Sequence, residues 1–241
     1  MVNLIIIGPA GSGKSTLTKS FGKWLENEGI MVDYVNLDPG AEKLPFTPSF
    51  DVRNIVKVEE LMRKEDLGPN GALIRAAEIM EERFAEVLEA VSALAPDFLL
   101  VDTPGQMEIF LFRTLGPKLA SSLRGRTVSA FLIDPVLMKK PNDFMVLKML
   151  GLVVELRLGI PSIEIVNKCD LLSLESLRVM EDSTKREIEG LVGSLAEELR
   201  GIIEKLEKKK RTLMVSATEG TGFLELYKAI GEAFCACGDL T

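Results

Sequence analysis

Histidine is absent from the 241 residues of this chain. A histidine general base, a histidine metal ligand and a Ser-His-Asp triad are therefore excluded. Glutamine is nearly absent too, since Gln106 is the only one. The three cysteines, Cys169, Cys235 and Cys237, provide no disulfide framework, which favours a reducing cytoplasm.

A long hydrophobic run is also missing. The longest apolar stretch, 144–158, is interrupted by Lys148, Glu155 and Arg157, so it is too short and too charged to cross a bilayer. No secretory signal precedes the first apolar run. The formal net charge of −7 argues against binding nucleic acid by neutralising phosphates. We expect a cytoplasmic protein with no membrane contact and no direct nucleic-acid contact.

What is present is a 46% apolar chain in which short apolar runs alternate with helical patterns. Six buried strands are predicted, at 4–7, 31–37, 98–101, 128–133, 162–166 and 212–215. Segment 41–54 has no clear period and is predicted to be an ordered surface loop. The alternation predicts an α/β fold with a mostly parallel sheet and helices on both faces. We expect one domain, 1–241, with helical insertions near 41–95 and 173–210.

The first motif follows the first strand and reads GPAGSGKS, from Gly8 to Ser15. It matches the phosphate loop of P-loop NTPases, in which a glycine-rich backbone and a helix N-terminus surround a polyphosphate. The backbone donors are expected at Gly8, Gly11, Ser12 and Gly13. Lys14 is predicted to bind the β- and γ-phosphates, and Ser15 to bind Mg²⁺.

The second motif, DTPGQ, follows the strand 98–101. A carboxylate at this end of a buried strand lies where open α/β sheets bind ligands. Asp102 is therefore predicted to hold the Mg²⁺ shell, and the Gly105 N–H to contact a γ-phosphate.

The third motif, NKCD, follows the strand 162–166 and selects the base. The carboxylate of Asp170 can accept from the ring N–H and the exocyclic amine of guanine, whereas adenine would leave it unpaired. Asn167 is expected to bond across the loop and to the base, and the Lys168 stem to lie over the ring. A further loop, Ser216, Ala217 and Thr218, is predicted to contact the guanine carbonyl.

Two weaker signals leave alternatives open. Asp38, at the tip of the second strand, is either a turn residue or a carboxylate that orients the attacking water. Cys235 and Cys237 offer only two thiolates, fewer than structural zinc needs unless two subunits share the ion, so ordinary thiols are favoured. The helix at 144–158 is expected to be core on one side, with room for a subunit interface.

The stretch LGPNGA, 67–72, contains ordinary turn residues. It is predicted to be a stiff, helix-breaking turn, because Pro69 fixes φ and the flanking glycines free the backbone. A nucleotide site without histidine and without an evident arginine finger gives the Asn70 amide a plausible catalytic task.

Taken together, GPAGSGKS, NLDPG, GPNG, DTPGQME, NKCD, SAT and CACGDL resemble the GPN-loop GTPases, of the archaeal homodimeric kind. The resemblance implies a P-loop GTPase fold with a helical insertion that carries the GPN loop. It also implies a nucleotide-dependent homodimer, and a protein client related to RNA polymerase assembly.

By the same resemblance, Thr16 would bind the α-phosphate and Asp38 would lie beside the γ-phosphate and the water. Gln106 and Glu108 would lie near that water and the dimer interface. Asn70 would project into the partner subunit's phosphate site. Lys14, Mg²⁺ and the loop amides would compensate the charge of the transferring group.

Two other functions remain open from the residues. One is a P-loop small-molecule kinase, against which NKCD argues, since such kinases seldom select guanine in this way. The other is a scaffold that binds GTP without hydrolysing it.

Overall fold

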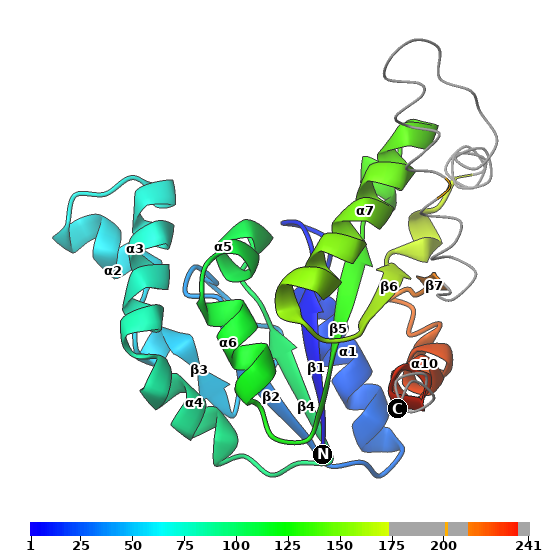
Figure 1. The fold of residues 1–241 in the computed structure, drawn as a ribbon, viewed down its shortest axis with the longest axis horizontal. Helices are drawn as coiled ribbons and strands as arrows, with labels where there is room; N and C mark the ends of the chain where they lie inside the picture. Colours follow the sequence, from blue (N-terminus) through cyan, green and yellow to red (C-terminus); the bar gives the residue numbers. More distant parts are fainter. Residues whose placement is uncertain (174–200, 202–211, 236–241) are drawn as a thin grey trace.

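The computed structural model describes residues 1–173, residue 201 and residues 212–235, which form a parallel sheet covered by helices (Figure 1). The sheet of the described residues has seven strands in the order β3-β2-β4-β1-β5-β6-β7, and every pairing between them is parallel. The strands are β1 (Val2–Ile7), β2 (Val32–Asn36), β3 (Phe50–Asp51), β4 (Phe98–Asp102), β5 (Arg126–Ile133), β6 (Ser162–Val166) and β7 (Leu213–Met214).

The described helices connect these strands and lie on both faces of the sheet (Figure 1). They are α1 (Lys14–Asn27), α2 (Val58–Lys64), α3 (Pro69–Glu82), α4 (Phe84–Ser92), α5 (Met107–Phe112), α6 (Leu115–Ser122), α7 (Pro141–Leu158) and α10 (Phe223–Cys235). Short 3-10 turns occur at Val52–Asn54, Pro135–Leu137 and Cys169–Leu171.

β1 shows why both faces need cover. Leu4 and Ile6 pack with residues of α1 and α10, whereas Ile5 and Ile7 pack with residues of α3 to α7. Because successive side chains of a strand point to opposite faces, a continuous apolar run requires a helical layer on each side. The predicted three-layer α/β fold is confirmed.

The prediction of an ordered surface loop at 41–54 is wrong in its second half. Phe50 and Asp51 form β3, which pairs with Val35 and Asn36 at the edge of the sheet. Two residues are too few to show a strand period, and only tertiary pairing with β2 makes them a strand. The sheet therefore has seven strands in the described residues, where six were predicted.

Segment 55–66, before LGPNGA, combines a strand-like beginning with a partly helical pattern, and the structure contains the helix α2 within it. The alternation Ile55 to Val58 imitates a strand, but α2 begins at Val58. Glu59 and Glu60 lie in its first turn and Arg63 and Lys64 in its last. These charges complement the helix dipole and stabilise helix over strand.

The later part of the helical insertion expected near 41–95 is two helices, α3 and α4, which meet at Arg83. The Arg83 side chain bonds Glu86 in the first turn of α4, at 2.8 and 2.7 Å. Asn70 also differs from expectation, since Pro69 and Asn70 form the first turn of α3 rather than a free turn before it. Proline is favoured at this first helical position because its missing N–H has no helical partner.

Some predictions fall outside the described residues. The charged region 174–210 is one of them, apart from Gly201, and Cys237 with the side chain of Cys235 is another. The division into a single domain 1–241 stays a prediction. Among the described residues, none of the helices has the length and hydropathy needed to span a membrane.

The packing of helices on both faces of the sheet predicts which leucines contribute to stability. Leu100→Ala in β4, fully buried under α1, is expected to lower the free energy of unfolding by about 2–5 kcal/mol, because it leaves a cavity. The matched change Leu224→Ala in α10, where the residue is 49% exposed, is expected to change it by less than about 1 kcal/mol. Urea unfolding measures both, and equal losses would contradict this assignment of the core.

Candidate functional site

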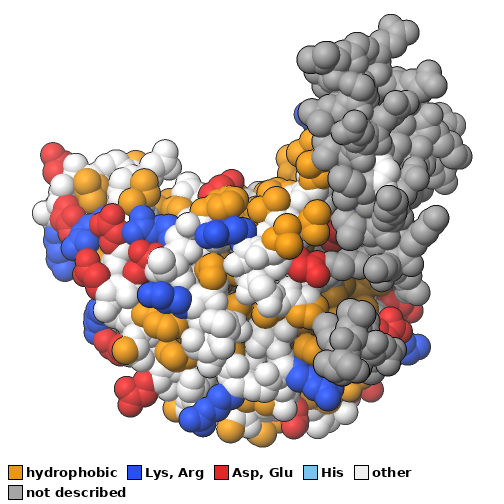
Figure 2. All heavy atoms as spheres, viewed as in Figure 1, with side chains coloured by type: hydrophobic (Ala, Val, Ile, Leu, Met, Phe, Trp, Pro, Cys, Tyr) orange, Lys and Arg blue, Asp and Glu red, His pale blue; other side chains and the backbone are white. Residues whose placement is uncertain are grey.

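The carboxyl ends of the strands meet at one edge of the sheet, and four predicted motifs lie there. The phosphate loop follows β1, DTPGQ follows β4, NKCD follows β6 and SAT follows β7. In Figure 2 the molecule is hollowed along this edge, between the end that carries α2 and α3 and the end that carries α7. Ligands of open α/β sheets bind at this edge.

The phosphate loop has the backbone that its glycines permit. Gly11 and Gly13 have φ of +78° and +91°, a region that disfavours any side chain. Lys14 Nζ donates to the carbonyl oxygens of Gly8 and Pro9, at 2.9 and 3.0 Å. Burial lowers the pKa of Lys14, and the nearby carboxylates of Asp102, Asp38 and Glu108 oppose that change. This buried ammonium lies at the start of α1, where phosphate oxygens are favoured.

Asn167 ties the loops of the site together. Its Nδ2 donates to the Ser12 carbonyl at 2.8 Å, and its Oδ1 accepts from the Ala217 N–H at 3.3 Å. A Cβ at Gly13 would lie 2.5 Å from Asn167 Nδ2, so glycine is required there for this close approach. The predicted bond across the loop is present. Its physical effect is to lock the NKCD, SAT and phosphate loops into one unit.

Asp102 is a buried carboxylate that lacks a full set of partners among the described residues. It is 1% exposed and its Oδ1 has no hydrogen bond there. Burial raises its pKa to about 7, helped by the charge of Asp38 and opposed by the Ser15 hydroxyl and Lys14. A buried oxygen without a partner, beside a serine hydroxyl, offers the hard oxygen ligands that Mg²⁺ prefers. The residues present therefore fit the predicted ion.

The two predicted ligands, Ser15 and Asp102, do not form a dense metal cluster. Among the described residues, no group of three or more acidic or cysteine side chains converges on one point. Magnesium in nucleotide sites is held by one or two protein groups, substrate phosphates and waters, so a sparse set is expected.

Asp38 lies at the tip of β2 and contacts the DTPGQ loop. Its Oδ2 accepts from the Gly105 N–H at 3.1 Å, and its Oδ1 accepts from the Gly40 N–H at 2.9 Å. The amide that was predicted to contact a γ-phosphate is thus bonded to a carboxylate of the same chain. Asp38 and Gly105 are brought together, which neither of the two motifs could show by itself.

Three further residues, which sequence reasoning missed, hold Asp38 in place. Buried Asn36 accepts from the Asp38 N–H at 3.0 Å and donates to Asp51 at 2.9 Å. Arg53 pairs with Asp51 at 2.6 Å and donates to the Ala41 carbonyl at 2.9 Å. The sequence signal was weak, because β3, which contributes Asp51, was not predicted.

The base-selecting loop is held by side chains on either side. Lys168 Nζ pairs with Asp134 Oδ2 at 2.7 Å, which joins NKCD to the tip of β5. Asp170 accepts a hydrogen bond from the Ser216 hydroxyl, and that hydroxyl lies 3.1 Å from Thr218 Oγ1. Sequence reasoning did not assign a role to Asp134, although its place at a strand tip was a signal.

The remaining predicted residues lie at the open side of the site. Asn70 Oδ1 accepts from Gln106 Nε2 of the same chain at 3.4 Å, and both atoms are near solvent. Glu108 is exposed and close enough to raise the pKa of Lys14. Thr16 is exposed in the first turn of α1. Within the chain, Asn70 thus lies beside the loop of DTPGQ, and its projection into a partner subunit stays a prediction.

Comparison with known proteins finds similar sequences that are described as nucleotide-binding proteins and GTPases. Residues 6–236 match a family model described as a conserved hypothetical ATP binding protein. A GPN-loop GTPase of Pyrococcus abyssi is 39% identical, over 99% of each chain. GPN-loop GTPase 1 of Dictyostelium discoideum is 28% identical over 96% of this chain, which spans only 61% of that longer protein.

Among solved structures, the fold is similar to the crystal structure of a GTPase in apo form from Pyrococcus abyssi. The TM-score is 0.89, with 37% identity and 98% of each chain covered. The structural similarity extends over almost the whole of both chains.

Because Asn167 joins two loops of the site, its substitution is predicted to lower the stability of the fold. Asn167→Ala is expected to lower the free energy of unfolding by about 1–3 kcal/mol, because it leaves the buried Ser12 carbonyl and Ala217 N–H without their partner. Asn27→Ala, at an exposed position at the end of α1, is the matched control and is expected to stay within about 0.5 kcal/mol. Chemical unfolding without nucleotide makes the comparison. A wild-type value for Asn167→Ala would refute the role of this amide.

Proposed function

The chain belongs to the GPN-loop GTPase family, and on that premise we propose that it binds GTP with Mg²⁺, hydrolyses it to GDP and phosphate, and acts as a nucleotide-dependent homodimeric switch. The chemistry of the site residues supports each step in turn.

The observation that carries the proposal is the joining of a phosphate loop to a guanine-selecting loop through Asn167. Asp170 is exposed at this edge, with Ser216 holding its carboxylate in place. A held carboxylate can accept from both N–H groups of guanine, and adenine offers neither of them in that position. Guanine is therefore favoured, although the matching family model is described by ATP.

The triphosphate is proposed to bind along the loop and the first turn of α1. The amides of Gly11, Ser12 and Gly13 would donate to its oxygens, and Thr16 would bind the α-phosphate. Lys14 would exchange its two carbonyl partners for β- and γ-phosphate oxygens. Ser15 and Asp102 would hold Mg²⁺, which supplies charge neutralisation to the phosphates when it is bound.

Hydrolysis needs a positioned water, and Asp38 is the proposed base that orients it. Its Oδ2 accepts from the Gly105 N–H. A γ-phosphoryl oxygen competes for the same N–H, which would release the Asp38 carboxylate to accept from water. The water oxygen then bonds to the γ-phosphorus while the bond to the β–γ bridging oxygen breaks.

Side-chain amides are proposed to complete the site. Gln106 and Asn70, 3.4 Å apart, can each bond the water or the γ-phosphoryl oxygens as charge develops. Glu108 lies on the same side and is proposed to orient the water or the partner's loop. Because neither a histidine base nor an assigned arginine finger contributes, we expect slow turnover, suited to a switch.

The dimer is proposed on the family resemblance and on exposed apolar side chains. Phe112 in α5 and Val146 and Leu156 in α7 are more than half exposed, and Figure 2 shows apolar side chains over α5 and α7. Burying such residues against a second copy would be favourable. A client related to RNA polymerase assembly is proposed on the resemblance alone.

Base selection is tested by Asp170→Asn. The wild type is expected to release phosphate from GTP in Mg²⁺ without any added acceptor, and much faster than from ATP. Asp170→Asn is expected to weaken GTP binding by about a hundredfold or more, because an amide meets the guanine N–H groups with donors of its own. Equilibrium binding and phosphate release measure the two effects.

Glu219→Gln, an exposed carboxylate of the adjacent loop, is the matched control and should keep wild-type selectivity. Unchanged selectivity in Asp170→Asn would refute the guanine assignment. An absolute need for an acceptor would favour a small-molecule kinase, and binding of GTP without turnover would favour a scaffold.

The role of Asn70 is tested by complementation. Asn70→Ala is expected to lower kcat about a hundredfold with little change in GTP affinity, since one donor to the developing charge is lost. Lys14→Ala is expected to abolish tight nucleotide binding. If Asn70 acts on the partner subunit, mixing the two inactive variants restores turnover, because the Asn70→Ala subunit binds GTP and receives Asn70 from its partner.

The same mixture distinguishes the opposite geometry. If Asn70 acts on its own chain, as its contact with Gln106 suggests, mixing restores nothing. Wild-type turnover by Asn70→Ala alone would end the idea that this residue is catalytic.

A further inference from the structure

The helix that carries Asn70 is bonded at both of its ends to the segment from Gln106 to Thr114. Asn70 lies in the first turn of α3 and contacts Gln106, the residue before α5. Glu81 lies in the last turn of α3 and contacts Arg113 and Thr114, just after α5. The two attachment points are about 16 Å apart along the axis of α3.

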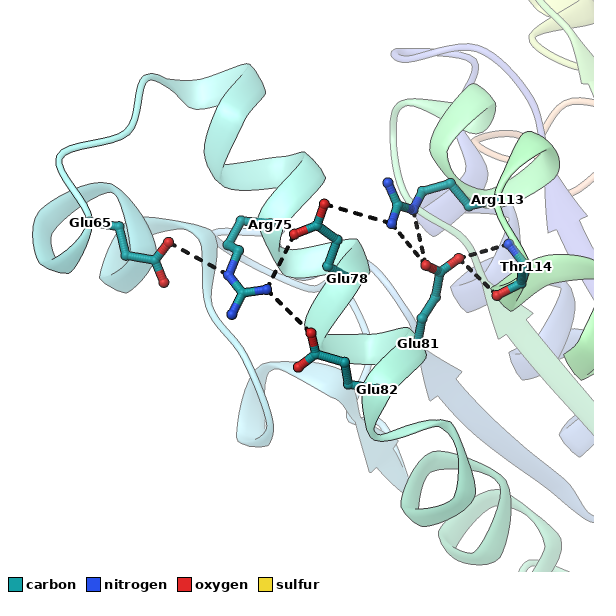
Figure 3. A network of polar contacts seen from close by, with 7 residues as sticks. All are labelled: Glu65, Arg75, Glu78, Glu81, Glu82, Arg113 and Thr114. Atoms are coloured by element: carbon teal, nitrogen blue, oxygen red, sulfur yellow. Dashed lines mark hydrogen bonds and ion pairs between the residues drawn. The ribbon is translucent and has the colours of Figure 1, made fainter.

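Both carboxylate oxygens of Glu81 accept hydrogen bonds from Arg113 and Thr114 (Figure 3). Its Oε2 accepts from Arg113 Nη2 at 2.8 Å and from Nε at 3.3 Å. Its Oε1 accepts from the Thr114 N–H at 2.7 Å and from the Thr114 hydroxyl at 2.9 Å. Burial raises the pKa of Glu81, but these hydrogen bonds outweigh it and leave the pKa below its ordinary value.

This contact differs from the other ion pairs of α3. Arg75 pairs with Glu65, Glu78 and Glu82, whose side chains are 40–64% exposed, and Glu78 also lies 3.9 Å from Arg113 (Figure 3). Exposed pairs contribute little to stability because water screens them. Glu81 is only 19% exposed and bonds a backbone N–H as well as two side chains, so its geometry is fixed.

α5 is also held tightly on its other side. Arg157 of α7 donates to the carbonyl oxygens of Leu111 and Phe112, which close the C-terminal end of α5. A Cβ at Gly116 would lie 2.3 Å from the Phe110 carbonyl, so α6 begins in close contact with α5. A displacement of α5 therefore cannot be absorbed within the 110–116 turn and must be shared with its neighbours.

We propose that Glu81 is a positioning residue for Asn70. It joins the end of α3 to the end of α5, so that the two helices move together. A displacement at Gly105 and Gln106 is therefore transmitted to Asn70. The inference rests on the proposed hydrolysis of GTP. When a γ-phosphoryl oxygen takes the Gly105 N–H from Asp38, the start of α5 shifts, and α3 shifts with it. Asn70 then reaches its catalytic position only while the Glu81 contact holds.

The test compares Glu81→Gln with Glu82→Gln. The first removes the charge and two of the acceptor positions while it keeps the size of the side chain. The second changes the next residue, which is 64% exposed and, within the part of the chain that the structure describes, paired only with Arg75. We expect Glu81→Gln to lower kcat about tenfold and to leave KM and GDP affinity within about twofold, because a misplaced catalytic group affects the chemical step. Glu82→Gln is expected to behave as the wild type.

A double-mutant cycle with Asn70→Ala separates positioning from a general structural loss. In the Asn70→Ala background, Glu81→Gln is expected to lower kcat by less than about twofold, because the group that it positions is already gone. Three results would each overturn the proposal. They are an equal tenfold loss of kcat in both backgrounds, a rise in KM that accounts for the loss of activity, and the same loss of kcat in Glu82→Gln. If Glu81→Gln does not fold, Arg113→Lys, which keeps the charge but loses the forked contact, takes its place in the cycle.

Wild-type turnover is measured first. No release of phosphate from GTP by the wild type would refute the proposed function and, with it, this inference. Normal wild-type turnover together with normal turnover of Glu81→Gln would refute the coupling alone.

Discussion

Parallel pairing around β1 determines where every functional segment of this protein lies. Ile6 pairs with Asp102 of β4, and Ile7 with Phe131 of β5, so the phosphate loop and the DTPGQ loop leave the sheet at the same level. The register continues outward, with Ile133 opposite Val166 and Val166 opposite Met214. Because carboxyl ends of parallel strands share one edge, four segments distant in the sequence form one site.

Several buried polar groups at this edge of the sheet lack charged partners among the described residues. Lys14 is buried against two carbonyl oxygens, the Asp102 Oδ1 has no partner among the described residues, and neither has the buried Ser12 hydroxyl. Burying polar groups in this way costs free energy. A triphosphate with its cation provides partners for these groups, which gives a physical reason for ligand binding to stabilise the fold at this place.

Much of this arrangement was predictable, since the motifs GPAGSGKS, DTPGQ and NKCD follow apolar runs that read as strands. The bond of Asn167 across the loop was expected and is present. What could not be predicted were the residues that hold the motifs. Asp51, in a two-residue strand that has no visible period, and Arg53, in the 3-10 turn after it, fix the Asp38 loop. Asp134 pairs with Lys168 from another strand tip. Pairing partners of this kind depend on packing rather than on local pattern.

The sequence by itself predicted the three-layer α/β fold, the phosphate loop and a preference for guanine, because each prediction depends on residues that are close together in the chain. Apolar runs and glycine spacing act over a few residues, so they can be read without knowing the packing. Only the tertiary structure decided that Asp38 bonds Gly105, 67 residues away, and that Glu81 bonds Thr114, 33 residues away. Such bonds form between segments that share no local pattern, and they exist only because the sheet and its helices bring those segments together.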